Sequence, residues 1–381
     1  MDGFKKAIVL LVFATFGSGL STALLPIYLN SKGLSLISIG FVFAVGAIIA
    51  SGIRFILGIF VDAYGKKPLL LLSIFGYVVF AIGLLFAESL GQFIFLKLLF
   101  DVSNIFFWTA FSPLFFDVLE KGEEGHGLGF RNAVLYAVLA FSPLIAGILA
   151  KQIGFNFLYV LSAFLSCIGL FFAAQINEKN QKHKANLKIL KKFLKTEYLK
   201  LLKIPNLKYT TLAIVAIDFL FTFWLIYMPI WLSQNGFSLD EIGNLMFGYI
   251  LLSAILQVSI GKAIDKFKIN RIAIPGLLFI WFGSLAFFAF KNFLSILLSR
   301  MALGIGGDMA YLPFVAHLAK TCKKEIHGIA TSFVFGLSGI FSGFAALLAG
   351  WLTNMFGIET ILISVSMISL FLIPILLGKK I

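Results

Sequence analysis

The chain has 381 residues, of which 60% are hydrophobic and 13% are charged, and its mean hydropathy is +1.01. A soluble protein of this length needs far more charge to cover its surface, so the composition excludes a soluble globular fold. The net charge of +14 leaves a nucleic-acid partner open until the positions of the charges are considered. The two cysteines, Cys167 and Cys322, provide neither a disulfide framework nor a metal-ligand spacing.

The apolar residues gather in unbroken runs of about 20 residues, the length that crosses a hydrocarbon core of ~30 Å as a helix. Membrane-spanning segments must be helices or closed barrels, and these runs do not alternate as barrel strands do. We therefore predict an all-α membrane protein. Its twelve transmembrane helices are expected at 6–29, 38–61, 68–87, 92–117, 128–150, 155–175, 209–233, 240–264, 271–290, 292–317, 328–352 and 357–378.

The basic residues are distributed unevenly between the segments that join these helices. If the N-terminus lies inside, the outer loops hold only Lys32, Lys151 and Lys291, and nearly all other Lys and Arg fall on the cytoplasmic side. This asymmetry follows the positive-inside rule, so we expect a multi-pass protein of the cell (plasma) membrane with both termini in the cytoplasm. The excess positive charge is therefore a topology signal, and no nucleic-acid partner is expected.

The two halves of the chain are similar when one is shifted by 203 residues against the other. Across 26–62, ten of thirty-seven positions are identical without a gap, and Gly40 aligns with Gly243. Parallel six-helix repeats are related by an axis along the membrane normal and enclose a site near the midplane. The predicted domains are an N-terminal six-helix bundle at 1–176, a cytoplasmic linker at 177–208 and a C-terminal six-helix bundle at 209–381.

The linker carries ten lysines against two acids. Apolar residues recur among the lysines at helical spacing, at Leu187, Leu190, Leu194, Tyr198 and Leu201. This pattern predicts an amphipathic helix on the anionic inner leaflet, and a solvated linker is the alternative.

The most specific motif lies in the predicted turn between the second and third helices. Residues 58–68 read Gly-Ile-Phe-Val-Asp-Ala-Tyr-Gly-Lys-Lys-Pro, which places an acid and paired lysines in a tight turn. A weaker copy lies at 261–266. The motif, the repeat and the helix count together resemble the major facilitator superfamily, a family of twelve-helix secondary transporters.

The resemblance implies a cytoplasmic gate at this turn. The gate residues that it implies are Gly58, Asp62, Gly65, Lys66, Lys67, Arg131, Gly261 and Asp265. In this family the acid at the position of Asp62 pairs with basic groups and a helix N-terminus of the other half. The lysines are expected to form ion pairs, with Asp117 and Glu120 as candidate partners. A solvated basic turn is the alternative, and the second copy, which lacks the later glycine, is the weaker candidate.

Two further stretches resemble motifs of the family. In the tenth predicted helix, residues 300–307 read Arg-Met-Ala-Leu-Gly-Ile-Gly-Gly, like the family's pattern of an arginine followed by glycines. In the fifth, residues 142–147 read Ser-Pro-Leu-Ile-Ala-Gly, which resembles the glycine-proline motif of the antiporter branch. Pro143 is expected to kink the helix and the small residues to admit a neighbouring helix, so close packing alone is the alternative explanation.

Ionisable side chains inside spanning helices cost several kcal/mol unless they face a cavity or a partner, so each is a candidate functional residue. The set is Arg54, Lys97, Asp101, Asp218, Arg300 and Asp308. At 1.5 Å per residue, Asp101 and Asp218 each lie about 13 Å from an end of their helix, close to the midplane. The resemblance implies that the first, fourth, seventh and tenth helices line the transport cavity.

The spacing of these groups suggests separate roles. Lys97 and Asp101 are four residues apart, so they share a helix face and form either a proton-responsive pair or a permanent structural ion pair. Asp218 has no cation near it in the sequence and is the preferred proton carrier. The alternative for Asp218 is an ion pair with Arg54 or Arg300. Asp308 lies nearer the cytoplasmic end and is expected to serve the gate.

These features predict a secondary active transporter that works by alternating access, with proton-coupled export of small organic or drug-like compounds as the leading reading. The alternative is a proton symporter or facilitator that takes up a small organic anion or metabolite, with Arg54, Lys97 and Arg300 binding its carboxylate or phosphate. The sequence holds no nucleotide-binding loop and no His-Glu or Asp-rich metal motif, so we expect no enzyme activity, cofactor or metal. The expected partners are a small-molecule substrate, a proton and the lipid bilayer, and the expected oligomeric state is a monomer.

Overall fold

The computed structural model describes the backbone over most of the chain. The described residues are 3–119, 124–176, 201, 207–322 and 324–373, with side chains omitted at 56, 58–64, 124–126, 324–327 and 329. The predicted linker at 177–208, with its expected amphipathic helix, therefore lies almost wholly outside the described residues.

The chain divides into two compact units. Unit 1 comprises Met1–Leu34, Val45–Leu187 and Phe237–Phe247, and unit 2 comprises Ser35–Ala44, Lys188–Gly236 and Gly248–Ile381. The second and eighth predicted spans therefore each contribute their first residues to one unit and the remainder to the other.

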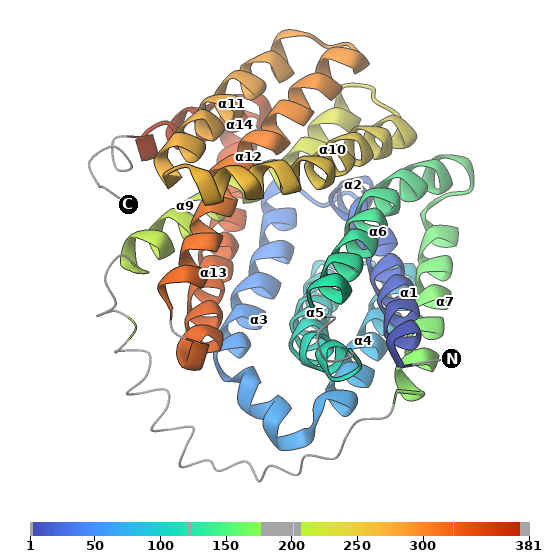
Figure 1. Cartoon of the computed structure of the whole chain (residues 1–381). Coiled ribbons are helices and arrows are strands. Elements are labelled where there is room, and N and C mark those ends of the chain that lie inside the picture. Colours follow the sequence, from blue (N-terminus) through green and yellow to red (C-terminus); the bar gives the residue numbers. More distant parts are fainter. Residues whose placement is uncertain (1–2, 120–123, 177–200, 202–206, 323, 374–381) are drawn as a thin grey trace. The chain divides into compact units, whose positions relative to one another are not determined.

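Unit 1 is a bundle built mainly from the first half of the sequence (Figure 1). Its helices are α1 (Gly3–Ala23), α2 (Leu25–Ser31), α3 (Leu36–Tyr64) apart from its first residues, α4 (Lys66–Phe86), α5 (Leu90–Asp117), α6 (Glu124–Gln152) and α7 (Phe155–Ala174). α1 packs against α6 and α7, while α4 packs against α5 and α7.

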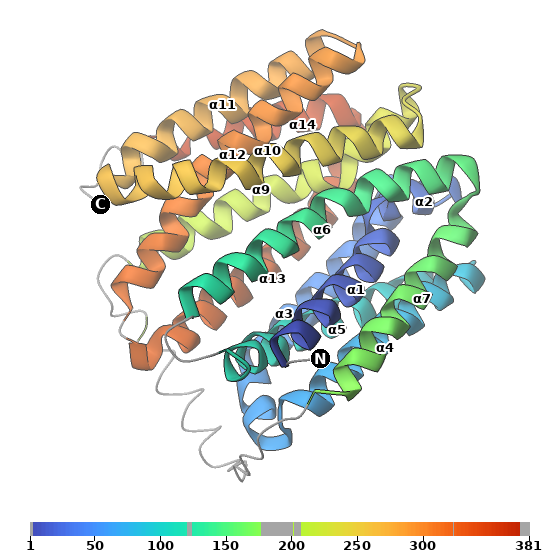
Figure 2. The same cartoon turned by 45° about the vertical axis from the view of Figure 1, so that its right-hand side comes forward.

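Unit 2 is the corresponding bundle of the second half, and α11 and α12 run side by side in both views (Figures 1 and 2). Its helices are α9 (Leu207–Gln234), α10 (Leu239–Lys266) apart from its first residues, α11 (Ile269–Ala289), α12 (Phe293–Thr321), α13 (Lys324–Phe356) and α14 (Ile358–Ser369). α9 lies at the centre of the packing, because it contacts α12, α13 and α14.

The twelve predicted spans all correspond to helices, and no strand occurs among the described residues. Eleven segments there are long and apolar enough to cross a membrane when α1 and α2 are counted together. The span predicted at 6–29 is divided at Leu24, because Pro26 stands in the first turn of α2 and lacks the N–H that a continuous helix needs. The all-α fold class is confirmed.

The repeat is visible in the turns. Gly33 and Gly236, which are equivalent under the 203-residue shift, both adopt a positive φ, of 84° and 88°. The turn that carries the family-like motif differs between the halves. Gly65 has a φ of 88° and links α3 to α4 by a single residue, whereas its equivalent Lys268 has a φ of −63°.

Close approaches between helices also obey the repeat. In unit 2, a Cβ added to Gly40 would lie 3.1 Å from the Cα of Gly350. In unit 1, a Cβ added to Gly243 would lie 3.2 Å from the Cα of Gly147. The shift that relates Gly40 to Gly243 also relates Gly147 to Gly350. The two close contacts are therefore equivalent, and each joins one glycine from the first half of the chain to one from the second. Small residues at these positions allow the backbones to touch.

A third close approach joins α11 and α12 inside unit 2. A Cβ on Gly306 would lie 2.7 Å from the carbonyl oxygen of Gly276 and 2.8 Å from the backbone nitrogen of Ile280. Both atoms belong to helical backbone, which cannot give way as a side chain can. Gly306, one of the glycines that follow Arg300, thus has a packing role.

We predict that Gly306→Ala lowers the free energy of unfolding by about 1–3 kcal/mol, because the added methyl group overpacks the α11–α12 contact. Gly52→Ala is the matched control, since Gly52 lies within α3 and has no atom within 4 Å of an added Cβ. Thermal unfolding of the purified proteins, followed by size-exclusion fluorescence, measures both. Equal melting temperatures for the two variants would contradict the packing argument.

Candidate functional site

The ion pair expected on α5 is present in unit 1. The Lys97 Nζ lies 2.6 Å from Asp101 Oδ1, and the Lys97 residue is 8% exposed. The Asp101 carboxylate fills the space beside Gly46 of α3, where even a methyl group would collide with it. Nearby, the Asn104 amide donates a hydrogen bond to the Tyr77 hydroxyl at 3.2 Å. The two charges therefore neutralise each other within one turn of one helix.

Unit 2 contains a cavity of about 250 Å³ between α9, α10 and α12. It is lined by Ile217, Asp218, Phe221, Tyr249, Ser253, Gly304, Gly307, Asp308 and Tyr311. The α12 residues recur at helical spacing, so one face of that helix forms a wall. The lining combines two carboxylates, three hydroxyl groups and three aromatic rings.

Asp218 enters the cavity from α9. Its Oδ2 accepts hydrogen bonds from the Ser338 hydroxyl of α13, at a very short distance, and from the Tyr311 hydroxyl at 3.4 Å. Among the described residues no ion pair joins Asp218 to Arg300, which was its alternative partner in unit 2. Hydroxyl groups rather than a cation hold this carboxylate.

Asp308 lines the same cavity from α12, although its depth along the helix suggested a separate gate role. One of its oxygens, Oδ2, is buried and has no hydrogen-bond partner in the described structure, while Ser253 of α10 interacts with the carboxyl group. Asp308 and Asp218 thus form a pair of acids that converge from two helices. The sequence did not predict that the two acids share a cavity. Their positions along each helix give the depth of a side chain, but not the neighbouring helices that it faces.

Arg300 lies behind the cavity wall. Its guanidinium carbon is 3.5 Å from the ring centroid of Tyr249 and 6.0 Å from that of Phe221, and the residue is 3% exposed. Its Nε has no hydrogen-bond partner among the described atoms. The Tyr249 ring and the Asp308 carboxylate therefore both stabilise this charge.

Each half stabilises one buried cation at the same position, but with different neighbouring residues. Lys97 is equivalent to Arg300, Gly46 is equivalent to Tyr249, and Asp101 is equivalent to Gly304. In unit 1 the small residue stands on α3 and the acid on α5, whereas in unit 2 the ring stands on α10 and the small residue on α12. Tyr249 lies against Gly304, since a Cβ there would be 2.9 Å from its ring. Tyr249 was not among the residues predicted from the sequence. Comparing the two halves position by position would have singled it out, because a ring replaces Gly46 where the acid Asp101 is replaced by Gly304.

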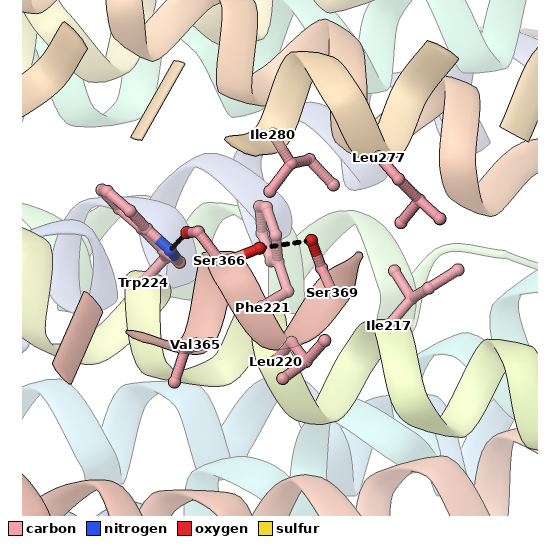
Figure 3. Close-up of a pocket in the computed structure, with 9 residues that line it drawn as sticks. All are labelled: Ile217, Leu220, Phe221, Trp224, Leu277, Ile280, Val365, Ser366 and Ser369. Atoms are coloured by element: carbon pink, nitrogen blue, oxygen red, sulfur yellow. Dashed lines mark hydrogen bonds between the residues drawn. The ribbon is translucent and has the colours of Figure 1, made fainter. Parts of the chain in front are cut away.

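A smaller apolar space of about 30 Å³ lies between α9, α11 and α14 (Figure 3). Figure 3 shows the Trp224 Nε1 donating to the Ser366 hydroxyl, at 3.1 Å, beside this space. Ile217 and Phe221 line both this space and the charged cavity. Phe221 therefore stands between the charged cavity and free volume on its other side.

The structure describes part of the first copy of the loop motif, at 58–68. The Lys66 Nζ lies 2.5 Å from Asp117 Oδ2, and the Lys67 ammonium donates to the Ala174 carbonyl at 2.6 Å. Side chains at 58–64, which include Gly58 and Asp62, lie outside the described ones. Arg131 donates to the Asn132 side chain at 2.9 Å.

The second copy of the motif forms a comparable ion pair. Asp265 lies 3.1 Å from the Lys320 Nζ at the end of α12, and Gly261 faces open space. Lys320 is equivalent to Asp117 under the repeat, so the two halves carry opposite charges at one position. In the first half the pair joins the start of α4 to the end of α5, and in the second half it joins the last turn of α10 to the end of α12.

Arg54 is half-buried on α3 of unit 1. Within the described residues, no group of three or more His, Cys, Asp or Glu side chains is placed to hold a metal ion.

We predict that Asp101→Asn destabilises the protein by about 3–5 kcal/mol, because it leaves the Lys97 ammonium buried without its counter-charge. The double variant Lys97→Met with Asp101→Leu removes both charges and should regain most of the loss. Melting temperatures of the purified variants test this. A single variant as stable as the wild type would show that the pair contributes little.

Comparisons with known proteins agree with this architecture. The sequence profile of the Major Facilitator Superfamily matches residues 7–240 and 211–380. An uncharacterized MFS-type transporter of Methanocaldococcus jannaschii, MJ1560, is 24% identical over 94% of both chains. The multi-drug resistance efflux pump PmrA of Streptococcus pneumoniae is 28% identical over 157 residues, which cover 39% of each chain.

Solved structures share the fold. A crystal structure of a mutant of the nucleoside transporter NupG superimposes with a TM-score of 0.86 at 12% identity, covering 99% of both chains. The crystal structure of the human organic anion transporter MFSD10 superimposes with a TM-score of 0.68 at 13% identity, covering 99% of this chain and 100% of the other. The chain belongs to the Major Facilitator Superfamily and is a multi-pass membrane transporter.

Proposed function

We propose that this transporter couples the export of small organic compounds to the inward movement of protons. The observation that carries the proposal is the convergence of Asp218 and Asp308 on one cavity of unit 2. Acids inside membrane helices are rare and commonly form proton relays in transporters. Here the two carboxyl groups lie among hydroxyl groups that can hold either the ionised or the neutral acid.

Alternating access would expose these acids to each side of the membrane in turn. In transporters built from repeated bundles, the site near the midplane stays fixed while the bundles move around it. A proton taken up outside would then be released inside, and substrate would move in the opposite direction. We propose the motif loops as the cytoplasmic gate, with the Lys66–Asp117 and Asp265–Lys320 ion pairs bracing their turns.

Two observations support export over uptake. PmrA, which is similar over part of the chain, is an efflux pump. In unit 1, Pro143 lies inside α6 and Gly147 contacts α10 closely, which the antiporter-like motif and close packing alone predict alike. Uptake of an organic anion is less well supported, because Asp101 already neutralises Lys97. From the distribution of the basic residues, we further propose that the chain lies in the plasma membrane with both termini in the cytoplasm. We also propose that it works as a monomer.

We predict that Asp218→Asn abolishes proton-driven efflux while expression stays intact. The carboxamide keeps the shape and the hydrogen bonds of Asp218 but cannot exchange a proton in this pH range. Fluorescent-dye transport into inverted vesicles, with an imposed pH gradient, measures the effect, and a loss of at least about tenfold is expected for a group of this kind.

Glu88→Gln, which removes an exposed carboxylate before α5, is the control and should transport like the wild type. Metabolite uptake measured in parallel in right-side-out vesicles separates export from symport. Unchanged gradient-driven transport in Asp218→Asn would remove this residue from the mechanism.

A further inference from the structure

We infer that the unit 2 cavity binds one singly charged organic cation that carries an aromatic or alkyl group, in the place where the empty cavity holds one proton. The inference rests on the proposed function and names the substrate class of the same site. It follows from the charge balance of the cavity, from its lining and from the contrast with unit 1.

The cavity has more acidic than basic groups around it. Asp218 and Asp308 bring two carboxylates, and Arg300, stacked on Tyr249, is the counter-charge in contact with the cavity wall. With both acids ionised, this group has a net charge of minus one. A net charge in the membrane interior is costly, so one more positive charge is needed. A proton satisfies that need, and so does the charged group of a cationic ligand.

The lining suits such a ligand. Phe221, Tyr249 and Tyr311 provide aromatic surface beside the two acids, and aromatic groups attract organic ammonium ions. Gly304 and Gly307 line the α12 side without side chains of their own. The buried Oδ2 of Asp308 has no protein donor in the described structure, so it can accept a ligand contact without losing an existing one.

An anionic ligand fits less well. Arg300 is not among the described residues that line the cavity, and the Tyr249 ring occupies one side of its guanidinium. A carboxylate in the cavity would face Asp218 and Asp308 before it reached this cation. In unit 1 the corresponding charge, Lys97, is already neutralised by Asp101, so that unit needs no added charge.

The site has few titratable groups. Tyr249 on α10 and Tyr311 on α12 line the cavity with the two acids, Arg300 on α12 lies behind the wall and interacts with Asp308, and α13 contributes the hydroxyl of Ser338. Other described ionisable groups on these helices of unit 2, and on α11 and α14 packed against them, do not line the cavity; they are Lys208, Tyr209, Tyr227, Lys262, Asp265, Lys266, Arg271, His317, Lys320 and Glu359. Competition between proton and cation is therefore expected to depend on Asp218 and Asp308.

The test compares three probes that share one benzene ring. Phenyltrimethylammonium is a permanent cation, tert-butylbenzene is its neutral isostere and benzenesulfonate is an anion. Binding to the purified full chain in lipid nanodiscs is measured by calorimetry, with empty nanodiscs subtracted. We expect the cation to bind at least about tenfold more tightly than either other probe.

Proton release in weakly buffered solution is the second readout. Each bound phenyltrimethylammonium should release about one proton, and its affinity should rise with pH because the proton competes for the same charge. Asp218→Asn and Asp308→Asn should each weaken cation binding by at least about tenfold and remove the proton release. Glu88→Gln should leave both quantities unchanged.

The wild-type measurements decide the inference even if a variant fails to fold. Equal binding of the three probes, stronger binding of the anion, no measurable cation binding, or cation binding without proton release would each overturn it. Dye efflux in vesicles is scored separately. Efflux without charge-selective binding contradicts only the inference, whereas charge-selective binding without proton-driven efflux contradicts the proposed function.

Discussion

The cost of an isolated charge in a hydrocarbon medium governs the arrangement of this protein. Three of the described charges inside the bundles have a compensating group nearby. Lys97 has Asp101, Arg300 has the ring of Tyr249, and Asp218 has two hydroxyl donors. The compensation in unit 1 is complete within one helix. In unit 2 it leaves two acids facing a cavity, and this difference assigns the proposed chemistry to unit 2.

The internal repeat makes the difference possible. Equivalent backbones place a cation at the same position of α5 and α12, and equivalent neighbours decide how it is held. A glycine and an acid at Gly46 and Asp101 give a closed ion pair, whereas Tyr249 and Gly304 give a stacked cation beside an open volume. The two halves share glycines at their turns and close contacts, and this keeps the fold the same. They differ at the positions beside the buried cation, and this allows the halves to have separate functions.

Much of this was predictable from the sequence because it is local or periodic. The twelve spans follow from runs of apolar residues, and the Lys97–Asp101 pair follows from a spacing of one helical turn. The cavity was predictable only in part. Tyr249 belongs to a chain rich in aromatic residues, and nothing nearby in the sequence distinguishes it. Ser338 meets Asp218 across 120 positions, so only the packing of α9 against α13 brings them together.

Infrared difference spectroscopy of the protein in lipid bilayers can locate the exchangeable proton, since protonated carboxyl groups absorb apart from carboxylates. We expect a carboxyl band that titrates, and that disappears when phenyltrimethylammonium is added. The band should be absent from the double variant Asp218→Asn with Asp308→Asn and should persist in Asp101→Asn. A titrating band that persists in the double variant and disappears in Asp101→Asn would place the exchangeable proton in unit 1 and rule out the role proposed for unit 2.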